Sequence, residues 1–376
     1  MRRSLLLSAV ACAVASGLKC LDNAGNPVDF WFMYKLPNGY DFAYVDPSTG
    51  DAQQPLQLFE RAMDDTSNPV ALVRTLLALA EKDDPLQGAP RSNSTQATGS
   101  QNSYLLYNDE PDTGTASSSY GHTKGVVAAA GTEGGLWIVH STPKFPASTG
   151  KAQFYFPETE IIYGQTFLCL SLSKSEIDTV GQQLLLNKPY IYHKVGMFAD
   201  TDATAEQFPN LADVLRGNWN AEGGTGVQQL NVGSELQTFT SFAKNSQWND
   251  DLYENLIAKH YNSGLLVESW LRGDEIGPDC PPGHPFSVVD AKTLSVVDGT
   301  GKNLTWTESQ DHAKWAVALD SSYVVCVGDI NRMTSQRKRG GGAVCFSNRN
   351  LCYSLYKTVT TSDVCSGSSG KEPLTP

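Results

Sequence analysis

The stretch HTKGVVAAAGTEGGLWIVH, residues 122–140, carries the pattern from which the fold can be predicted. It begins with His122-Thr123-Lys124, continues as an apolar run, turns through a glycine-rich segment and returns as a second apolar run. The pattern occurs again at residues 312–329, HAKWAVALDSSYVVCVGD, where His312-Ala313-Lys314 precedes the apolar run. Two apolar runs joined by a short turn are typical of a β-hairpin. The repeat therefore predicts two similar hairpins that lie far apart in the chain.

The histidine and lysine of each copy are two residues apart, which determines where their side chains point. Residues i and i+2 of a strand point to the same face, so each histidine projects beside its lysine. In a hairpin, the end of the return strand lies opposite the start of the first strand. We therefore expect His140 beside the first pair, and Asp329 with Asn331 beside the second. Hairpins related by a pseudo-two-fold axis would direct both pairs into one cleft.

Two histidines and two lysines in one cleft suit a phosphodiester. Ammonium groups repel cations and cannot ligate while protonated, which argues against a metal in this cleft. They can neutralise the non-bridging oxygens, while one neutral imidazole attacks phosphorus and one imidazolium protonates the leaving oxygen. Because four nearby groups are cationic or can become so, we expect neutral imidazoles to be favoured and acidic surroundings to be needed. The candidate catalytic residues are His122, Lys124, His312 and Lys314, with His140, Asp329 and Asn331 expected beside them.

The composition is that of a globular protein with a mixed fold. The chain has 376 residues, of which 40% are hydrophobic and 18% charged, and the net charge of −12 excludes a general polyanion-binding surface at neutral pH. Strands and helices alternate along the chain, which predicts an α/β fold. The expected elements are a strand at 30–34, a helix at 70–80 capped by Asn68, a loop at 87–103, a helix opened by a capping box at 173–176 and ending at 186, a helix at 250–260 and a strand at 265–270.

The first residues are typical of a secretory signal peptide, which we place at residues 1–17. Two arginines precede an apolar run over 5–14, and small residues follow at 15–17. No later stretch approaches the ~20 apolar residues of a membrane span. Removal of this segment would leave seven cysteines, and an odd number on the secretory route predicts disulfides and one cysteine that is free or paired between chains. The sequons at Asn93 and Asn303 predict glycosylation in the same compartment.

Several motifs resemble the deoxyribonuclease II family of acid, lysosomal-type nucleases. They are long, follow one another in order and extend from about Leu18 to Cys365. The motifs are GNPVD at 25–29, YKLP at 34–37, YND at 107–109, GHTKGV at 121–126, WIVHS at 137–141, YGQT at 163–166, DHAKW at 311–315, CVGDINR at 326–332 and RGGG at 339–342.

The resemblance implies a phospholipase D-like fold, in which two pseudo-two-fold-related halves share one active-site cleft. The halves would span residues 18–225 and 226–365, followed by a loose tail at 366–376. It also implies a lysosomal or secreted enzyme that hydrolyses DNA at acid pH without metal or cofactor. The reaction would pass through a phosphohistidine and leave 3′-phosphate and 5′-hydroxyl ends. By analogy with phospholipase D, His122 is favoured as nucleophile and His312 as acid and base. The resemblance also implies that His140 and Asn331, together with Asp329, bind the phosphate.

The resemblance also implies a disulfide pairing, and the chain departs from the phospholipase D motif at one position of each copy. The family's disulfides would join Cys20 to Cys169, Cys280 to Cys365 and Cys326 to Cys345, which leaves Cys352 as a free thiol. The aspartate that follows His-x-Lys in phospholipase D proper is absent, because Ala129 and Leu319 stand at that offset. A general phospholipase is therefore less favoured.

An acidic enzyme that acts on DNA needs a local basic surface. One dense cluster precedes three glycines, and we predict that it follows DNA phosphates beside the cleft. Its members are Arg332, Arg337, Lys338 and Arg339. No recognition-helix or zinc-finger pattern is present, so no sequence-specific readout of DNA is expected.

Two alternatives remain. A site of two histidines and two lysines could cleave RNA with the help of the 2′-hydroxyl, and a 2′,3′-cyclic phosphate product would distinguish that reaction. A secreted binding protein of the same fold would be expected to have lost one His-x-Lys pair, whereas both are intact here.

Overall fold

The computed structural model describes residues 17–49, 57–59, 69–80, 102–131, 133–148, 156–220, 222, 224–233, 237–297 and 301–365. The predicted signal peptide up to residue 16, the helix cap at Asn68, the sequon at Asn93 and the tail at 366–376 lie outside these residues. So does most of the loop predicted at 87–103, whose last two residues belong to a strand instead.

The first large sheet is built from strands between residues 30 and 195, in the order β10-β6-β7-β8-β9-β3-β4-β5. Its strands are β3 (Phe30–Lys35), β4 (Phe42–Val45), β5 (Gln57–Phe59), β6 (Asn102–Asn108), β7 (Lys124–Ala130), β8 (Gly135–His140), β9 (Gln165–Leu172) and β10 (Ile191–Val195). A separate short ladder joins β1 (Cys20–Leu21) to β2 (Pro27–Val28).

The second large sheet has the order β11-β12-β18-β17-β16-β13-β14-β15, with β19 paired to β14. Its strands are β11 (Thr225–Val232), β12 (Gln237–Lys244), β13 (Leu265–Glu268), β14 (Val288–Val297), β15 (Asn303–Thr307), β16 (Trp315–Ala318), β17 (Val324–Gly328), β18 (Gly341–Ser347) and β19 (Val359–Ser362). Asn303, the second sequon, is exposed at the start of β15.

Both predicted hairpins are confirmed. The strands β7 and β8 pair antiparallel with Gly125 opposite Val139, and β16 and β17 pair antiparallel with Trp315 opposite Val327. The antiparallel run β7-β8-β9-β3 in the first sheet thus corresponds to the run β16-β17-β18-β12 in the second. The repeat seen in the sequence is therefore a repeat of four neighbouring strands.

The helices lie between and around the sheets. They are α1 (Ala71–Ala80), α2 (Lys174–Asn187), α3 (Thr201–Gln207), α4 (Pro209–Arg216), the π-helix η5 (Tyr253–Ala258) continued by α5 (Lys259–Tyr261), and α6 (Arg349–Thr358). The capping box of α2 is confirmed, because Ser173 and Glu176 each bond to the other's backbone N–H. The helix predicted at 250–260 is present, but most of it is wound as a π-helix.

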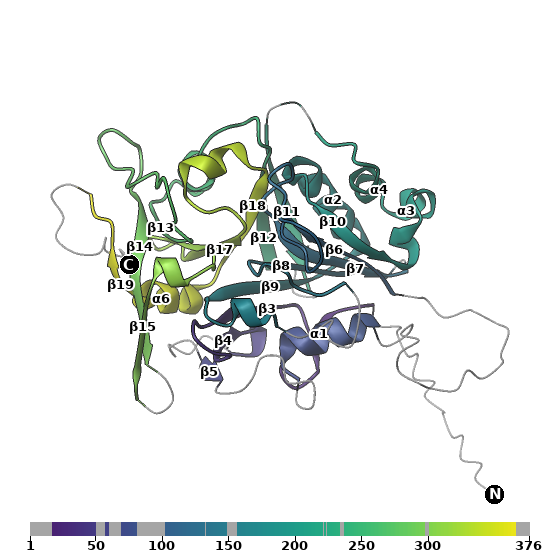
Figure 1. Ribbon diagram of the computed structural model, residues 1–376, viewed down its shortest axis with the longest axis horizontal. Helices are drawn as coiled ribbons and strands as arrows, with labels where there is room; N and C mark the ends of the chain where they lie inside the picture. The colour runs from purple at the N-terminus through teal and green to yellow at the C-terminus, as the bar shows by residue number, and fades with distance from the viewer. Residues whose placement is uncertain are drawn as a thin grey trace, which may run out of the picture.

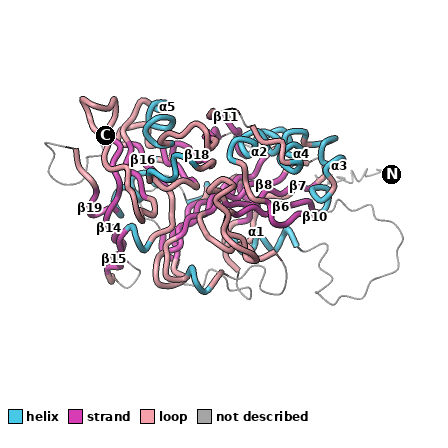
Figure 2. Tube along the Cα trace, turned by 45° about the horizontal axis from the view of Figure 1, so that its top comes forward, coloured by secondary structure: helices cyan, strands magenta, loops and turns pink. Residues whose placement is uncertain are grey.

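The two sheets share one core at their junction. Phe30 of the first sheet contacts Phe239 and Phe346 of the second, with ring centroids 5.3 and 5.4 Å apart. Helices α2 and α4 lie on one face of the first sheet and α1 on the other (Figure 1). The strands β14, β15 and β19 form one end of the molecule, and β10 with α3 forms the other (Figure 2). This arrangement brings β17 of the second hairpin into contact with β8 and β9 of the first sheet.

The cysteines pair as the resemblance implied. Disulfides join Cys20 to Cys169, Cys280 to Cys365 and Cys326 to Cys345. Cys352 is free and buried in α6, and burial raises the pKa of its thiol to about 12. In the part of the chain that the structure describes, no helix has the length and apolar character needed to cross a membrane.

Candidate active site

His122 is held at the junction of the sheets by backbone groups of the second half. Its N–H donates to the carbonyl oxygen of Gly340 at 2.8 Å, and its Nδ1 lies 2.6 Å from the carbonyl oxygen of Asp329. Because a carbonyl oxygen can only accept, Nδ1 carries the proton and the neutral ring has its lone pair on Nε2. Burial, followed by the charge of Lys124, lowers the pKa of His122 well below its usual value and favours this neutral ring.

Glycine is required directly before His122. A Cβ atom at Gly121 would lie 1.9 Å from the carbonyl oxygen of Asn187 and 2.9 Å from that of Gly340. A Cβ atom at Gly340 would lie 2.4 Å from the same oxygen of Asn187. The two glycines thus allow the backbone before His122, the backbone before β18 and the end of α2 to pack closely against one another.

His312 is held in the corresponding way by the first half. Its N–H donates to the carbonyl oxygen of Gly164 at 2.9 Å, and its Nδ1 lies 3.3 Å from Oε2 of Glu160. The ring stacks on Tyr163, with centroids 4.0 Å apart and planes 11° apart. Its Nε2 is buried and has no partner among the described residues. Burial lowers the pKa of His312, while the hydrogen bond to Glu160 opposes this shift.

The two lysines have different partners. Lys124 Nζ forms a buried ion pair with Oδ1 of Asp109, and Arg339 Nη2 binds the other carboxylate oxygen at 3.0 Å. Burial alone would raise the pKa of Asp109, but Lys124, together with His122 and Arg339, lowers it overall, so this carboxylate stays charged. Lys314 Nζ donates to the carbonyl oxygen of His312.

The two His-x-Lys pairs approach each other at Asp329, which contacts His122 and directly follows Gly328, the residue bonded to Lys314. Burial, then the charge of Lys124, lowers the pKa of Lys314 to about 7. Lys314 in turn contributes to the lowered pKa of His122, and Lys124 to that of His312. These directions agree with the contacts at Asp329, because charges in neighbouring positions lower each other's pKa when they have the same sign.

Asp329 lies beside both pairs. As the hairpin predicts, it directly follows Gly328, whose N–H donates to the carbonyl oxygen of Lys314 at 2.9 Å. It also contacts the first pair, because its Oδ2 accepts from Thr123 Oγ1 at 2.7 Å and its carbonyl accepts from His122. Burial raises the pKa of Asp329 to about 7, so in acid this carboxyl group is neutral.

His140 and Asn331 are both buried near the pairs. His140 follows Val139, the partner of Gly125, and so lies beside Lys124. Its Nδ1 accepts from the Thr142 N–H at 3.2 Å, which leaves the proton on Nε2, an atom without a partner among the described residues. Burial, followed by the charge of Lys124, lowers the pKa of His140 to about 3, so the ring is neutral. Oδ1 of Asn331 is likewise buried and unpartnered within the described residues.

Arg332 does not belong to a DNA-facing surface. Its side chain is 0% exposed and forms ion pairs with three carboxylates, those of Asp251, Asp279 and Asp290. These acids come from distant segments and satisfy the guanidinium inside the second half. The expectation that Arg332 follows DNA phosphates is therefore wrong, because the charge is compensated and enclosed.

The other members of the basic cluster lie nearer the surface. Lys338 is exposed and Arg337 half-buried, while Arg339 is bound to Asp109. Lys338 helps to line a cavity of about 270 Å³, and no histidine or lysine of the two His-x-Lys pairs belongs to its lining. Its lining also includes Tyr120, Gly121, Lys188, Trp219 and Gly340.

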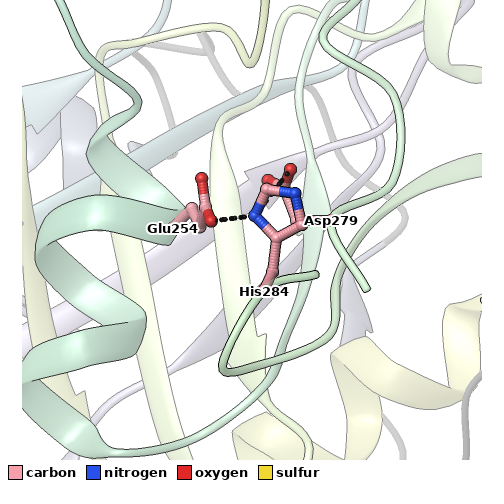
Figure 3. A group of neighbouring side chains, drawn as sticks. All are labelled: Glu254, Asp279 and His284. Carbon is pink, nitrogen blue, oxygen red and sulfur yellow. Dashed lines mark hydrogen bonds and ion pairs between the residues drawn. The ribbon is translucent and has the colours of Figure 1, made fainter. Parts of the chain in front are cut away.

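One group of side chains has ligand atoms of metal-binding type close together. Glu254, Asp279 and His284 each place such an atom within 4.8 Å of the others, with the imidazole between the two carboxylates (Figure 3). Oδ2 of Asp279 already accepts from Arg332, so a cation here would face a guanidinium. The arrangement is that of an ion-pair network, in which His284 lies 3.5 Å from Oδ1 of Asp279 and also pairs with Glu254.

Three residues at the site were not singled out from the sequence. Asp109 binds Lys124, Glu160 binds His312, and Tyr163 stacks on His312. Asp109 and Tyr163 belong to the motifs YND and YGQT that carry the resemblance, but the resemblance assigned no role to either residue. Glu160 had no such signal, because its function depends on a contact with a residue about 150 positions away.

Repeated α/β halves that each carry one His-x-Lys pair define a phospholipase D-like fold. The family model described as Deoxyribonuclease II matches residues 19–365. The chain therefore belongs to the deoxyribonuclease II family.

Individual relatives are similar in sequence to this chain over nearly its whole length. The chain is similar to Plancitoxin-1 of Acanthaster planci, at 33% identity over 96% of each chain. It is similar to Deoxyribonuclease-2-alpha of Rattus norvegicus, at 34% identity over 91% of this chain and 93% of the relative. Deoxyribonuclease-2 of Caenorhabditis elegans is 31% identical over 93% of this chain and 94% of the relative.

Proposed function

We propose that the protein is a metal-independent acid endonuclease that hydrolyses DNA to 3′-phosphate and 5′-hydroxyl ends through a phosphohistidine. The observation that carries this proposal is the difference between the two histidines. Nδ1 of His122 faces a carbonyl oxygen, which suits a neutral ring, whereas Nδ1 of His312 faces the Glu160 carboxylate, which suits an imidazolium.

In the first step, the Nε2 lone pair of neutral His122 attacks phosphorus and forms the N–P bond. The bond from phosphorus to the 5′ oxygen breaks, and Nε2–H of the His312 imidazolium protonates that oxygen. The 5′-hydroxyl product leaves, and the phosphoryl group on His122 keeps its ester to the 3′ oxygen. Lys124 and Lys314 stabilise the charge that develops on the non-bridging oxygens.

In the second step, the now neutral His312 removes a proton from water. The hydroxide equivalent attacks phosphorus, the N–P bond breaks, and its electron pair returns to Nε2 of His122. The product is a 3′-phosphate, and both histidines regain their starting protonation. We assign to His140 Nε2–H and to the amide N–H of Asn331 the binding of phosphate oxygens, since His140 lies opposite Lys124 and Asn331 follows Asp329 by two residues.

DNA would also contact the cavity lined by Lys338, which includes Gly121, the residue directly before His122. Lys188 and Lys338 supply positive charge there, and Tyr120 and Trp219 supply aromatic faces on which a base can stack. Among the residues that the structure describes, no recognition helix or zinc finger lies at the site, so we propose cleavage without sequence specificity. We further propose that the enzyme is lysosomal or secreted, with a cleaved signal peptide and glycosylation at Asn93 and Asn303.

The test is digestion of supercoiled plasmid in excess chelator at about pH 5 and about pH 7.5. We expect cleavage in acid, and ends that polynucleotide kinase labels without prior dephosphorylation. His122→Ala and His312→Ala should each lower the rate by about 100-fold to 10,000-fold, while His260→Ala, a change at an exposed histidine of α5, should not. Cleavage that chelator abolishes, or that leaves 5′-phosphate ends, would contradict the proposal.

A further inference from the structure

Two buried lysines outside the His-x-Lys pairs occupy matching places in the two halves. Lys35 is the last residue of β3 and pairs with Gln165, the first residue of β9. Lys244 is the last residue of β12 and pairs with Gly341, the first residue of β18. Both lysines are 0% exposed. Since β3-β9 and β12-β18 are equivalent pairs of strands, the two lysines are equivalent by position.

The two ammonium groups also make equivalent bonds. Lys35 Nζ donates to three carbonyl oxygens that precede Gln165 by five, four and two residues, those of Glu160, Ile161 and Tyr163. Lys244 Nζ donates to three carbonyl oxygens that precede Gly341 by the same intervals, those of Gln336, Arg337 and Arg339, at 3.0, 2.8 and 2.6 Å. Each ammonium thus uses all three of its donors on one loop.

An aromatic ring completes each arrangement. Lys35 Nζ lies 5.1 Å from the ring centroid of Phe156, and Lys244 Nζ lies 6.0 Å from that of Trp248. Burial lowers the pKa of Lys35 to about 7 and that of Lys244 to about 8. Burying an ammonium costs free energy that an apolar side chain of the same length would not. Packing alone therefore does not explain why lysine stands at both positions.

The loop that each lysine binds contacts the catalytic histidine of the other half. The loop held by Lys35 ends in Gly164, whose carbonyl accepts from the His312 N–H, and includes Glu160 and Tyr163, which contact the His312 ring. The loop held by Lys244 ends in Gly340, whose carbonyl accepts from the His122 N–H.

We infer that Lys35 and Lys244 are positioning residues. Each lysine holds a loop of its own half in place, and that loop orients the histidine of the other half. The inference rests on the proposed catalytic roles of His122 and His312. It assigns Lys35 to His312 and Lys244 to His122, a crossed pattern that a general role in stability would not produce.

The test compares Lys35→Met and Lys244→Met with Lys174→Met. Lys174 is a matched control, because its Nζ also has an aromatic neighbour, Phe208 at 5.8 Å, and a hydrogen-bond partner, Gln207, but it lies at the start of α2. Ring resonances of the six histidines are followed by NMR during a pH titration, with His122 and His312 assigned from their alanine variants. This readout needs no DNA, so it separates failure of this inference from failure of the proposed function.

We expect Lys35→Met to shift the titration of His312 and leave that of His122 in place, and Lys244→Met to do the reverse. With DNA, both should lower kcat by about 100-fold, the cost of a catalytic group misplaced by about 1 Å, with little change in KM because neither lysine touches substrate. Lys174→Met should change nothing.

Unchanged titrations of both histidines in both methionine variants would overturn the inference, and so would equal shifts of both histidines in each variant. If a methionine variant does not fold, Lys35→Gln and Lys244→Gln, which keep two N–H donors, take its place and should show the same crossed shifts. If these variants unfold as well, the lysines are general core residues and the inference fails.

Discussion

The Nδ1 atom of His122 lies 2.6 Å from the carbonyl oxygen of Asp329, a residue 207 positions further along the chain. The same nitrogen of His312 lies 3.3 Å from a carboxylate oxygen of Glu160. Five residues before β18, at the place that corresponds to Glu160 before β9, the second half has the neutral Gln336. Two halves built alike therefore place different groups against Nδ1 of their histidines, a carbonyl oxygen in one case and a carboxylate in the other.

Glu160→Gln should move the pH dependence of DNA cleavage towards acid. The hydrogen bond and charge of Glu160 raise the pKa of His312 against the effect of burial, so their removal lowers that pKa further and less imidazolium is present at a given pH. The limb of the pH–rate profile that falls with rising pH should shift to lower pH. Glu158→Gln, on the same 3₁₀-helix η3 (Glu158–Glu160) but exposed, is the control and should leave the profile in place.

Asp109→Asn should weaken both catalysis and folding. The change leaves the buried Lys124 without its carboxylate, and breaking a buried ion pair in this way costs about 3–5 kcal/mol. Because the pKa of Asp109 is lowered on folding, its stabilisation is present above the unfolded pKa and is lost only as the pH falls through the lower folded value. The loss should therefore appear in urea unfolding at about pH 5 as well as at neutral pH. Glu110→Gln, which removes an exposed ion pair with Lys144, should cost less than about 1 kcal/mol.

Arg332→Met and Lys338→Met should separate structural charge from DNA-binding charge. Arg332→Met leaves three buried carboxylates without their cationic partner and should lower the free energy of unfolding by about 3–5 kcal/mol.

Lys338→Met removes an exposed charge beside the cavity and should reduce the slope of log K for DNA against log salt by about one, with little effect on unfolding. A normal unfolding midpoint for Arg332→Met, or an unchanged salt slope for Lys338→Met, would contradict these assignments.

His284→Asn should lower the Tm in acid but not in mild alkali. The hydrogen bond to Glu254, with the charge of Asp279, raises the pKa of His284 above its unfolded value. A raised pKa contributes stability that is fully present below the unfolded pKa of about 6.5 and is lost as the pH rises through the folded pKa. The Tm difference from the wild type should thus be larger at about pH 5 than at about pH 8.5. His260→Asn controls for loss of an exposed histidine.

Features with a local cause could be predicted from the sequence. The two hairpins follow from apolar runs, turns and spacing, and the α2 capping box follows from Ser173 and Glu176. The pairing of six cysteines came from the resemblance rather than from spacing, since spacing alone allows many combinations.

Features that depend on contacts between distant segments could not be predicted. A run of arginines and lysines looks alike in sequence whether it faces solvent or not, and only the fold brings Asp251, Asp279 and Asp290 around Arg332. The roles of Asp109 and Glu160, and the contacts that Asp329 also makes with the first pair, have the same origin. The choice of π over α winding at 253–258 leaves no mark in the hydrophobic pattern.

The carbonyl groups of Gly164 and Gly340 have a consequence for how such a protein could arise. The glycine carbonyl of each half accepts a hydrogen bond from the histidine of the other half. In a single half, the backbone N–H of the histidine would therefore lack this partner, and its ring would lack the contacts from the other half. An ancestor with one repeat would have had to work as a homodimer. Gene duplication and fusion would then have freed the two copies to diverge, one retaining an acid and the other an amide at the matching position.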